Sequence, residues 1–270
     1  MKVLSKDGTE IYYETYGNPG ARPQLFFVHG IGGDLDAWQF VLPALLAAGY
    51  GALALDLRGS GYSGHPRGAA DYAMARMIED VAAVAQTAGT PVVVVGHSGG
   101  AVLVEAFALA HPELVAGLVL IAGSYGPPHY MRSKVLRALC NAGIAVGGLL
   151  SPRAGKPWHS PYPPGKHHQE VEVRGLARTM WHNSLASYLY FSRELLRVDL
   201  GESLAQIKAP TLLIVGDKDG IYPLATSQTM HAKIAGSVLK VIPGANHVLP
   251  LNRPRDTALA MLEFLKTFQI

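Results

Sequence analysis

The sequence is poor in cysteine, in charged residues and in long apolar runs, and each shortage excludes a class of protein. Its 270 residues include one cysteine, Cys140, so no disulfide can form within the chain. Charged residues make up 16% of the chain, and the basic ones are scattered along it with a net charge of only +3. This pattern predicts neither a nucleic-acid partner nor binding to an anionic membrane surface. No run of about 18 apolar residues is present, so we expect no membrane span.

The first residues also lack the features of a secretory signal. Residues 1–8 contain no apolar central region and lead directly into a predicted strand. We therefore expect a cytoplasmic protein, whose oligomeric state the sequence leaves open. Hydrophobic residues make up 49% of the chain, which is enough for a sizeable core in one large domain.

Apolar runs and amphipathic segments alternate along most of the chain. A hairpin is expected at 2–5 and 9–16; strands are expected at 24–28, 50–57, 92–95, 115–122, 209–216 and 237–242; helices are expected at 36–48, 71–88, 101–110, 223–235 and 254–268. Pro43 either breaks the first helix or marks the first turn of a second one. The alternation predicts an α/β fold with a mostly parallel, twisted sheet of about eight strands and helices on both faces.

The alternation stops between residues 125 and 200. This segment holds two of the three tryptophans and a proline-rich stretch at 157–164, with helical patterning on either side. We expect a core formed by 1–124 and 201–270, and a helical cap formed by 125–200 over the carboxyl ends of the strands. The alternative is a helical ornament on the surface.

A glycine-rich turn with a central serine follows the strand at 92–95. The turn is Gly96-His97-Ser98-Gly99-Gly100, and a good helix former comes next. A serine between a buried strand and a helix lies on a strained turn that exposes its hydroxyl. Glycines at 96 and 100 allow strand and helix to approach closely. The free N–H groups at the helix N-terminus suit a nucleophile and a developing oxyanion.

A serine nucleophile needs a base, and the base needs a carboxylate that orients it. Gly216-Asp217-Lys218-Asp219 follows the next-to-last predicted strand, and His247 follows the last one. Open α/β sheets place their ligands at the carboxyl ends of the strands, where both loops begin. Asp217 competes with Asp219 for the role of the acid, and the motif spacing favours Asp219.

In these motifs the sequence resembles the α/β-hydrolase superfamily, over nearly the whole chain outside the cap. The matching motifs are His29-Gly30-Ile31, Trp38, the stretch from Asp56 to Ser63, the turn around Ser98, the loop from Gly216 to Asp219, and His247. The resemblance implies Ser98 as nucleophile, His247 as general base and then acid, and Asp219 as the orienting acid. It also implies an oxyanion hole made by the backbone N–H groups of Ile31 and Gly99.

The sequence departs from the family pattern near two of these residues. Family members often have glycine before the late histidine and an acidic residue five positions after it, where this chain has Asn246 and Asn252. We expect this to change the support of the last loop rather than the chemistry. Gly99 stands where a bulkier residue is common, which should leave room beside the nucleophile.

The residues expected to line the substrate pocket are His29, Gly30, Trp38, Tyr125 and Trp181.

Other motifs have plainer interpretations. Gly59 to Gly64 matches the dinucleotide fingerprint after a strand, but His65-Pro66 follows where the fingerprint needs a helix. His167-His168 has no ligand at helical i+4 spacing, so we expect no metal, and we expect no cofactor. His97 is interpreted as a packing residue, and His29 as a residue that holds the oxyanion loop.

The sequence therefore predicts a serine hydrolase that forms an acyl-enzyme with a small or medium apolar carboxylic ester, its small-molecule substrate. The same triad could cleave a lactone, an amide or a carbon–carbon bond, because specificity lies in the cap and the pocket. Epoxide and haloalkane hydrolysis are disfavoured, because such relatives place aspartate where Ser98 stands. A ligand-binding receptor on the same scaffold, without turnover, is a third hypothesis.

Overall fold

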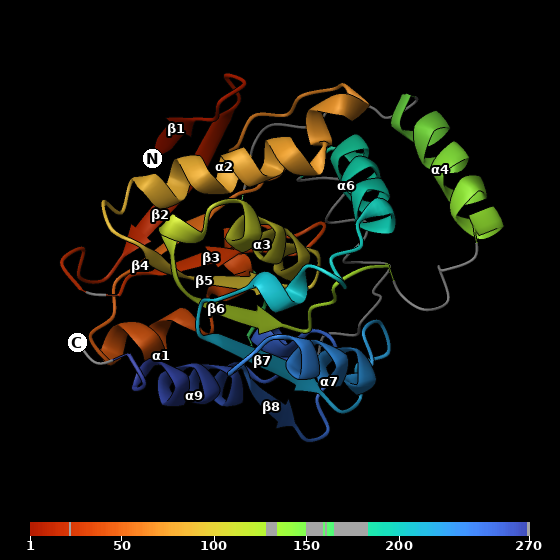
Figure 1. The fold of residues 1–270 in the computed structure, drawn as a ribbon. Helices are drawn as coiled ribbons and strands as arrows, with labels where there is room; N and C mark the ends of the chain where they lie inside the picture. Colours follow the sequence, from red (N-terminus) through yellow and green to blue (C-terminus); the bar gives the residue numbers. More distant parts are fainter. Residues whose placement is uncertain (22, 128–133, 150–158, 160, 165–182, 269–270) are drawn as a thin grey trace.

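The computed structural model describes residues 1–21, 23–127, 134–149, 159, 161–164 and 183–268. Eight strands form one sheet in the order β1-β2-β4-β3-β5-β6-β7-β8 (Figure 1). β1 and β2 pair antiparallel, as do β2 and β4, and the other neighbours are parallel. The strands are β1 (Lys2–Leu4), β2 (Glu10–Tyr16), β3 (Leu25–Val28), β4 (Ala52–Leu55), β5 (Val92–His97), β6 (Val115–Ile121), β7 (Thr211–Gly216) and β8 (Val238–Ile242). The predicted α/β fold is confirmed.

Helices cover both faces of the sheet (Figure 1). One apolar cluster joins the sheet to α2 (Met74–Gln86), α3 (Gly99–Ala110) and α7 (Leu224–Lys233). A second cluster, on the other face, joins it to α1 (Leu42–Ala47) and α9 (Pro254–Leu265). The described residues also include the short elements η1 (Leu35–Trp38), η2 (Ala69–Tyr72), η3 (Pro112–Leu114), η5 (Leu204–Gln206) and α8 (Leu249–Asn252).

Two predicted helices begin elsewhere than expected. The segment 36–48 forms the 3-10 turn η1 and then α1, with Pro43 in the first turn of α1, which was the second of the two alternatives. The segment 71–88 begins as η2, and α2 starts only at Met74. Ala73 has an extended ψ of 139°, which interrupts the helical backbone at that point.

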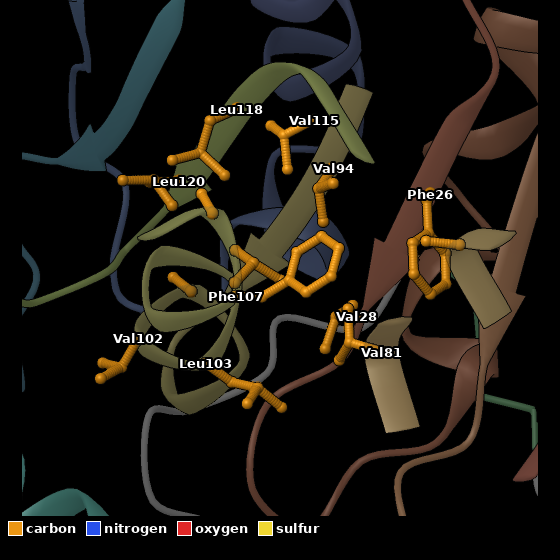
Figure 2. Packing of buried hydrophobic residues seen from close by; sticks show 14 of the residues in the cluster. Phe26, Val28, Val81, Val94, Val102, Leu103, Phe107, Val115, Leu118 and Leu120 are labelled. Carbon is orange, nitrogen blue, oxygen red and sulfur yellow. The ribbon is translucent and has the colours of Figure 1, made fainter. Parts of the chain in front are cut away.

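The core beneath α3 fixes the position of the residue at which this helix begins. Phe107 packs among Val94 of β5 and Leu118 of β6 (Figure 2). Fully burying a side chain of this size contributes about 1.5–3 kcal/mol. Because α3 is held against β5 by this packing, the turn between them at Ser98 is also held in place.

Two further helices lie at the end of the sheet toward which the arrows of β6 and β7 point (Figure 1). α4 (Lys134–Leu149) packs against α6 (Leu185–Arg197), and α6 also contacts η2 and α3. A helical cap over this end of the sheet remains our interpretation, because much of 125–200 lies outside the described residues. Among the helices that are described, none combines the length and the apolar character needed to cross a bilayer.

Candidate active site

Ser98 lies on the turn between β5 and α3, with a backbone φ of 54° and ψ of −121°. A positive φ is rare for a residue with a side chain and costs conformational energy. The surrounding backbone holds this conformation. The N–H of Ser98 donates to the carbonyl of Ile121 at 2.9 Å, and the carbonyl of Ser98 accepts from the N–H of Ala101 at 2.9 Å.

The glycines on either side of Ser98 are required by close backbone approach. A Cβ atom at Gly96 would lie 2.6 Å from the Cα of Ala101, so strand and helix could not come this close with a side chain there. A Cβ atom at Gly100 would lie 2.3 Å from the carbonyl oxygen of His29. The start of α3 therefore packs directly against the oxyanion loop, which we define as residues 29–35.

His247 bridges Ser98 and Asp219, which come from distant parts of the chain. Its Nε2 lies 2.8 Å from Ser98 Oγ, and its Nδ1 lies 2.9 Å from Asp219 Oδ2. The other carboxylate oxygen of Asp219 accepts from the N–H groups of Ile221 at 2.9 Å and Tyr222 at 2.8 Å. These two hydrogen bonds fix the carboxylate, so that Oδ2 faces the imidazole.

Asp217 does not take part in this arrangement. It is exposed, and its Oδ1 accepts from the N–H of Gly244 at 2.6 Å. Of the two candidate acids, the geometry therefore favours Asp219.

The loop 29–35 lies against the turn that holds Ser98. A Cβ atom at Gly30 would lie 3.2 Å from the Cβ of Ser98. His29 donates from Nδ1 to the carbonyl of Gly30 at 2.8 Å and accepts at Nε2 from the N–H of Leu57 at 3.0 Å. Burial lowers the pKa of His29, which keeps the ring neutral as these two bonds require. His29 thus acts as an anchor for the loop.

His97 supports the loop that carries His247. Its Nε2 lies 3.0 Å from the carbonyl oxygen of His247, and its ring lies edge-on to Trp38 with centroids 6.5 Å apart. Burial, and then the nearby His247, lower the pKa of His97 to about 3. The sequence predicted His97 to be a packing residue. In the structure its neutral ring also donates a hydrogen bond to the backbone carbonyl of His247.

The residues expected to line the pocket have different positions. Trp38 is completely buried against Phe27, with ring centroids 5.0 Å apart, so it belongs to the core and the expectation that it lines a pocket is wrong. Tyr125 is half-buried beside the first core cluster. Trp181 lies outside the described residues.

A small cavity adjoins the oxyanion loop. It lies between residues 29–32 of this loop, residues 57–60 of the turn after β4, and α6. The residues that line it are His29, Gly30, Ile31, Gly32, Leu57, Arg58, Ser60, Ser187, Tyr188 and Phe191. His29 and Gly30 are among these residues, and whether the cavity holds substrate stays a prediction.

The space beside Gly99 is filled by a side chain that the sequence did not identify. A Cβ atom at Gly99 would lie 2.8 Å from Leu195 Cδ1 and 3.0 Å from Ile31 Cγ1. The expectation that Gly99 leaves open room is therefore wrong, because Leu195 of α6 occupies that room. The unusual glycine was the only signal in the sequence that another residue lies there.

The two departures from the family pattern near His247 contact each other. Asn252 Nδ2 donates to Asn246 Oδ1 at 2.8 Å, and the same oxygen accepts from the N–H of Val248 at 3.1 Å. This pair bridges the two ends of the loop that carries His247.

The structure gives no support for a metal site among the residues that it describes. No group of three or more histidine, cysteine, aspartate or glutamate side chains within them is arranged to hold an ion. His167 and His168 lie outside the described residues.

The chain is similar to several known proteins along most of its length. Protein ABHD8 of Mus musculus is 29% identical over 247 residues, which are 89% of this chain and 54% of that protein. The chain thus spans about half the length of the first curated relatives that it matches. Epoxide hydrolase A of Mycobacterium tuberculosis is 27% identical, covering 100% of this chain and 98% of that protein. The crystal structure of a hydrolase from Pseudomonas aeruginosa PA01 matches with a TM-score of 0.78 and 25% identity, over 98% of this chain and 97% of that one.

A sequence profile covers most of the chain as well. The profile described as "Alpha/beta hydrolase family" matches residues 25–260, which include the serine turn, the acid loop and the late histidine. The chain belongs to the alpha/beta hydrolase family.

Proposed function

We propose that the protein is a serine hydrolase that cleaves small or medium apolar carboxylic esters through an acyl-enzyme. The observation that carries the proposal is the pair of hydrogen bonds that links Ser98 through His247 to Asp219, at 2.8 and 2.9 Å. This is the geometry in which an imidazole removes the proton of a hydroxyl while a carboxylate fixes its tautomer.

The reaction has two halves that use the same groups. Ser98 Oγ attacks the ester carbonyl carbon while His247 Nε2 takes the hydroxyl proton, giving a tetrahedral intermediate. The C–O bond to the leaving alcohol then breaks, and His247 gives that proton to the alkoxide. A water molecule then attacks the acyl-enzyme carbonyl while His247 Nε2 takes one of its protons. The bond between the acyl carbon and Ser98 Oγ breaks, His247 gives that proton to Ser98 Oγ, and the carboxylic acid leaves.

The charge that develops on the carbonyl oxygen needs hydrogen-bond donors. We propose the backbone N–H groups of Ile31 and Gly99, since the side chain of Ile31 lies against Gly99 and the loop lies against Ser98. Removing one such donor in other enzymes costs about 10²–10³ in turnover.

The surroundings of Ser98 support an apolar acyl group. Ile31 and Leu195 lie beside Gly99, and Leu57 and Phe191 line the adjoining cavity. The charged residue in the cavity wall, Arg58, is occupied by a buried ion pair with Asp80. A substrate with a carboxylate next to the reacting carbonyl would find no free cation among the described residues of this wall.

The similarity to epoxide hydrolase A brings epoxide opening into the test. An epoxide has no carbonyl oxygen on which the proposed oxyanion donors could act. The serine at position 98 therefore favours acyl transfer.

The experiment measures turnover of p-nitrophenyl acetate, butyrate and octanoate, with a lactone, an anilide, an aryl diketone and styrene oxide beside them. We expect ester turnover that Ser98→Ala lowers by about 10³-fold or more. A fluorophosphonate should label Ser98, as located by peptide mass spectrometry. Esters that turn over equally well in Ser98→Ala would overturn the proposal, and so would turnover confined to the epoxide. Absence of turnover together with tight ligand binding would favour the receptor hypothesis.

A further inference from the structure

Asn183, just before α6, contacts the oxyanion loop from the side of the cap. Its Nδ2 donates to the carbonyl of Gly33 at 3.2 Å, and its Oδ1 accepts from the N–H of Gly61 at 3.2 Å. The residue is only 2% exposed. One buried amide thus joins the oxyanion loop to the turn formed by residues 56–63, which we call the Asp56 turn.

A second cap residue acts on the same two segments. His159 Nε2 lies 2.6 Å from Asp56 Oδ2, and Asp56 Oδ1 accepts from the N–H of Leu35 at 3.0 Å. The ring of His159 also lies edge-on to Tyr62, with centroids 4.4 Å apart. His159 therefore fixes the carboxylate of Asp56, and this carboxylate in turn binds the backbone of Leu35 at the C-terminal end of the oxyanion loop.

The near end of the loop is anchored within the core. The N–H of Leu57 donates to His29 Nε2, and the N–H of Gly33 donates to the carbonyl of Gly30 at 3.1 Å. Ile31, whose N–H is the proposed donor, lies in sequence between the anchor at His29 and the contacts that Asn183 and Asp56 make with Gly33 and Leu35. Its position thus depends on groups from both parts of the molecule.

We propose that Asn183 is a positioning residue for ester hydrolysis, which sets the oxyanion loop so that the N–H of Ile31 meets the developing oxyanion. His159 supports it through Asp56. The inference rests on the proposed function, because it concerns the same reaction. Asn183 binds backbone, and His159 binds a carboxylate that itself binds backbone, so each acts on the loop and not on Ser98.

A general stabilising role would have a different signature. A displacement of about 1 Å in a group that binds the transition state costs orders of magnitude in rate. Such a displacement weakens binding of a tetrahedral adduct and lowers kcat, while substrate binding changes little. Loss of stability alone would lower the unfolding temperature and leave kcat per folded molecule unchanged.

The experiment compares Asn183→Ala and the isosteric Asn183→Asp with a matched control, Gln39→Ala. Gln39 Nε2 donates to the carbonyl of Tyr162 at 2.8 Å, so the control removes another amide contact between core and cap, outside the oxyanion loop. Asn183→Asp keeps the acceptor for Gly61 but sets a carboxylate against the carbonyl of Gly33.

We expect both Asn183 variants to lower kcat for p-nitrophenyl butyrate by about 10–100-fold, within the cost of losing one oxyanion donor. KM should stay within about twofold, and affinity for a trifluoromethyl ketone, which forms a tetrahedral adduct, should fall in parallel with kcat. Gln39→Ala should keep kcat and the affinity for the trifluoromethyl ketone within about twofold of the wild-type values.

The proposal is overturned if the variants unfold at lower temperature but keep kcat and adduct affinity, or if Gln39→Ala loses as much as they do. If Asn183→Ala does not fold, Asn183→Asp carries the same comparison. Failure of the proposed function is separate, because it would appear as full ester turnover in Ser98→Ala.

Discussion

The carboxylates near His247 differ in their partners, and this difference decides which one can orient the imidazole. Asp219 is buried and held by two backbone N–H groups, whereas Asp217 is exposed and bonded to Gly244. We expect Asp219→Asn to lower kcat by about 10⁴-fold, because the amide no longer selects the reactive tautomer of His247. Asp217→Asn is the matched control, and its kcat should stay within about threefold of the wild-type value. Steady-state rates with p-nitrophenyl butyrate check this, and the reverse ranking would transfer the role to Asp217.

Glu105 is a buried carboxyl within α3 that the proposed chemistry does not use. It is 0% exposed, and neither of its oxygens has a hydrogen-bond partner among the residues that the structure describes. Burial raises the pKa of Glu105 well above its usual value, so the folded protein holds this group protonated where the unfolded chain ionises it. The cost of burying Glu105 is therefore smallest below the pKa that this group has in the unfolded chain. Stability is lost as pH rises from there toward the folded pKa.

We expect Glu105→Leu to be more stable than the wild type, by about 1–3 kcal/mol for the relieved polar group. The gain should be larger at pH 9 than at pH 5, and urea unfolding at both pH values measures it. Glu263→Leu, on the exposed surface of α9, serves as the control and should change stability little at either pH. A gain that does not grow with pH would show that Glu105 is ionised in the folded protein.

Among single residues, the sequence identified those that lie at strand ends and missed those that lie in or next to α6. Ser98, Asp219 and His247 follow recognisable strands, so their meeting could be expected from the topology, and the structure brings them together. Asn183 and Leu195 reach the site only through the packing of α6, for which the sequence gives no register. Trp38 was assigned to a pocket from its motif, which does not determine burial.

α6 contributes a side chain to the immediate surroundings of Ser98. Leu195 occupies the space that a side chain at position 99 would take. We expect Leu195→Ala to open this space, raising the ratio of kcat/KM for octanoate to that for acetate by about 10-fold, since a few methylenes in an apolar pocket are worth 1–3 kcal/mol. p-Nitrophenyl esters of graded length measure this ratio.

The matched control for this prediction is Leu189→Ala on the same helix. Leu189 lies toward α4, where a Cβ atom at Gly147 would meet its Cδ1 at 3.0 Å. The Leu189→Ala substitution deletes the same atoms as Leu195→Ala, but at a distance from Gly99. The dependence of kcat/KM on the ester chain length should therefore not change. If both variants shift the profile equally, the effect comes from loosening α6 and not from the space beside Ser98.

The elements themselves were largely predictable, because buried parallel strands give uninterrupted apolar runs. β5 and β6 are examples, and both lie close to the predicted ranges. The errors fall at helix starts. η1 ends before Pro43 begins α1, and Ala73 separates η2 from α2, and neither break changes the apolar pattern from which the helices were inferred.

Arg58 ties together parts of the molecule that are distant in sequence. Its guanidinium binds both oxygens of Asp80 in α2 at 2.5 Å and reaches Asp7, in the turn between β1 and β2, at 2.9 Å. It also donates to the carbonyl of Asp71 in η2. The side chains of Arg58 and Asp80 are completely buried. Arg58 thus adds a buried ionic link to the bonds that hold the Asp56 turn to the core, such as the one between the N–H of Leu57 and His29.

Removing Arg58 would leave the carboxylate of Asp80 buried without its partner. We expect Arg58→Leu to lower the free energy of unfolding by about 3–5 kcal/mol, as for other buried pairs broken on one side. The double variant with Asp80→Leu should recover most of that loss, because no unpaired charge remains. Lys240→Leu breaks an exposed pair with Glu263 and should cost at most about 1 kcal/mol. Urea unfolding of Arg58→Leu, Asp80→Leu, the double variant, Lys240→Leu and the wild type measures the coupling. A double variant as unstable as the sum of its single variants would contradict this account, and would mean that Arg58 acts through its contacts with Asp7 and η2 instead.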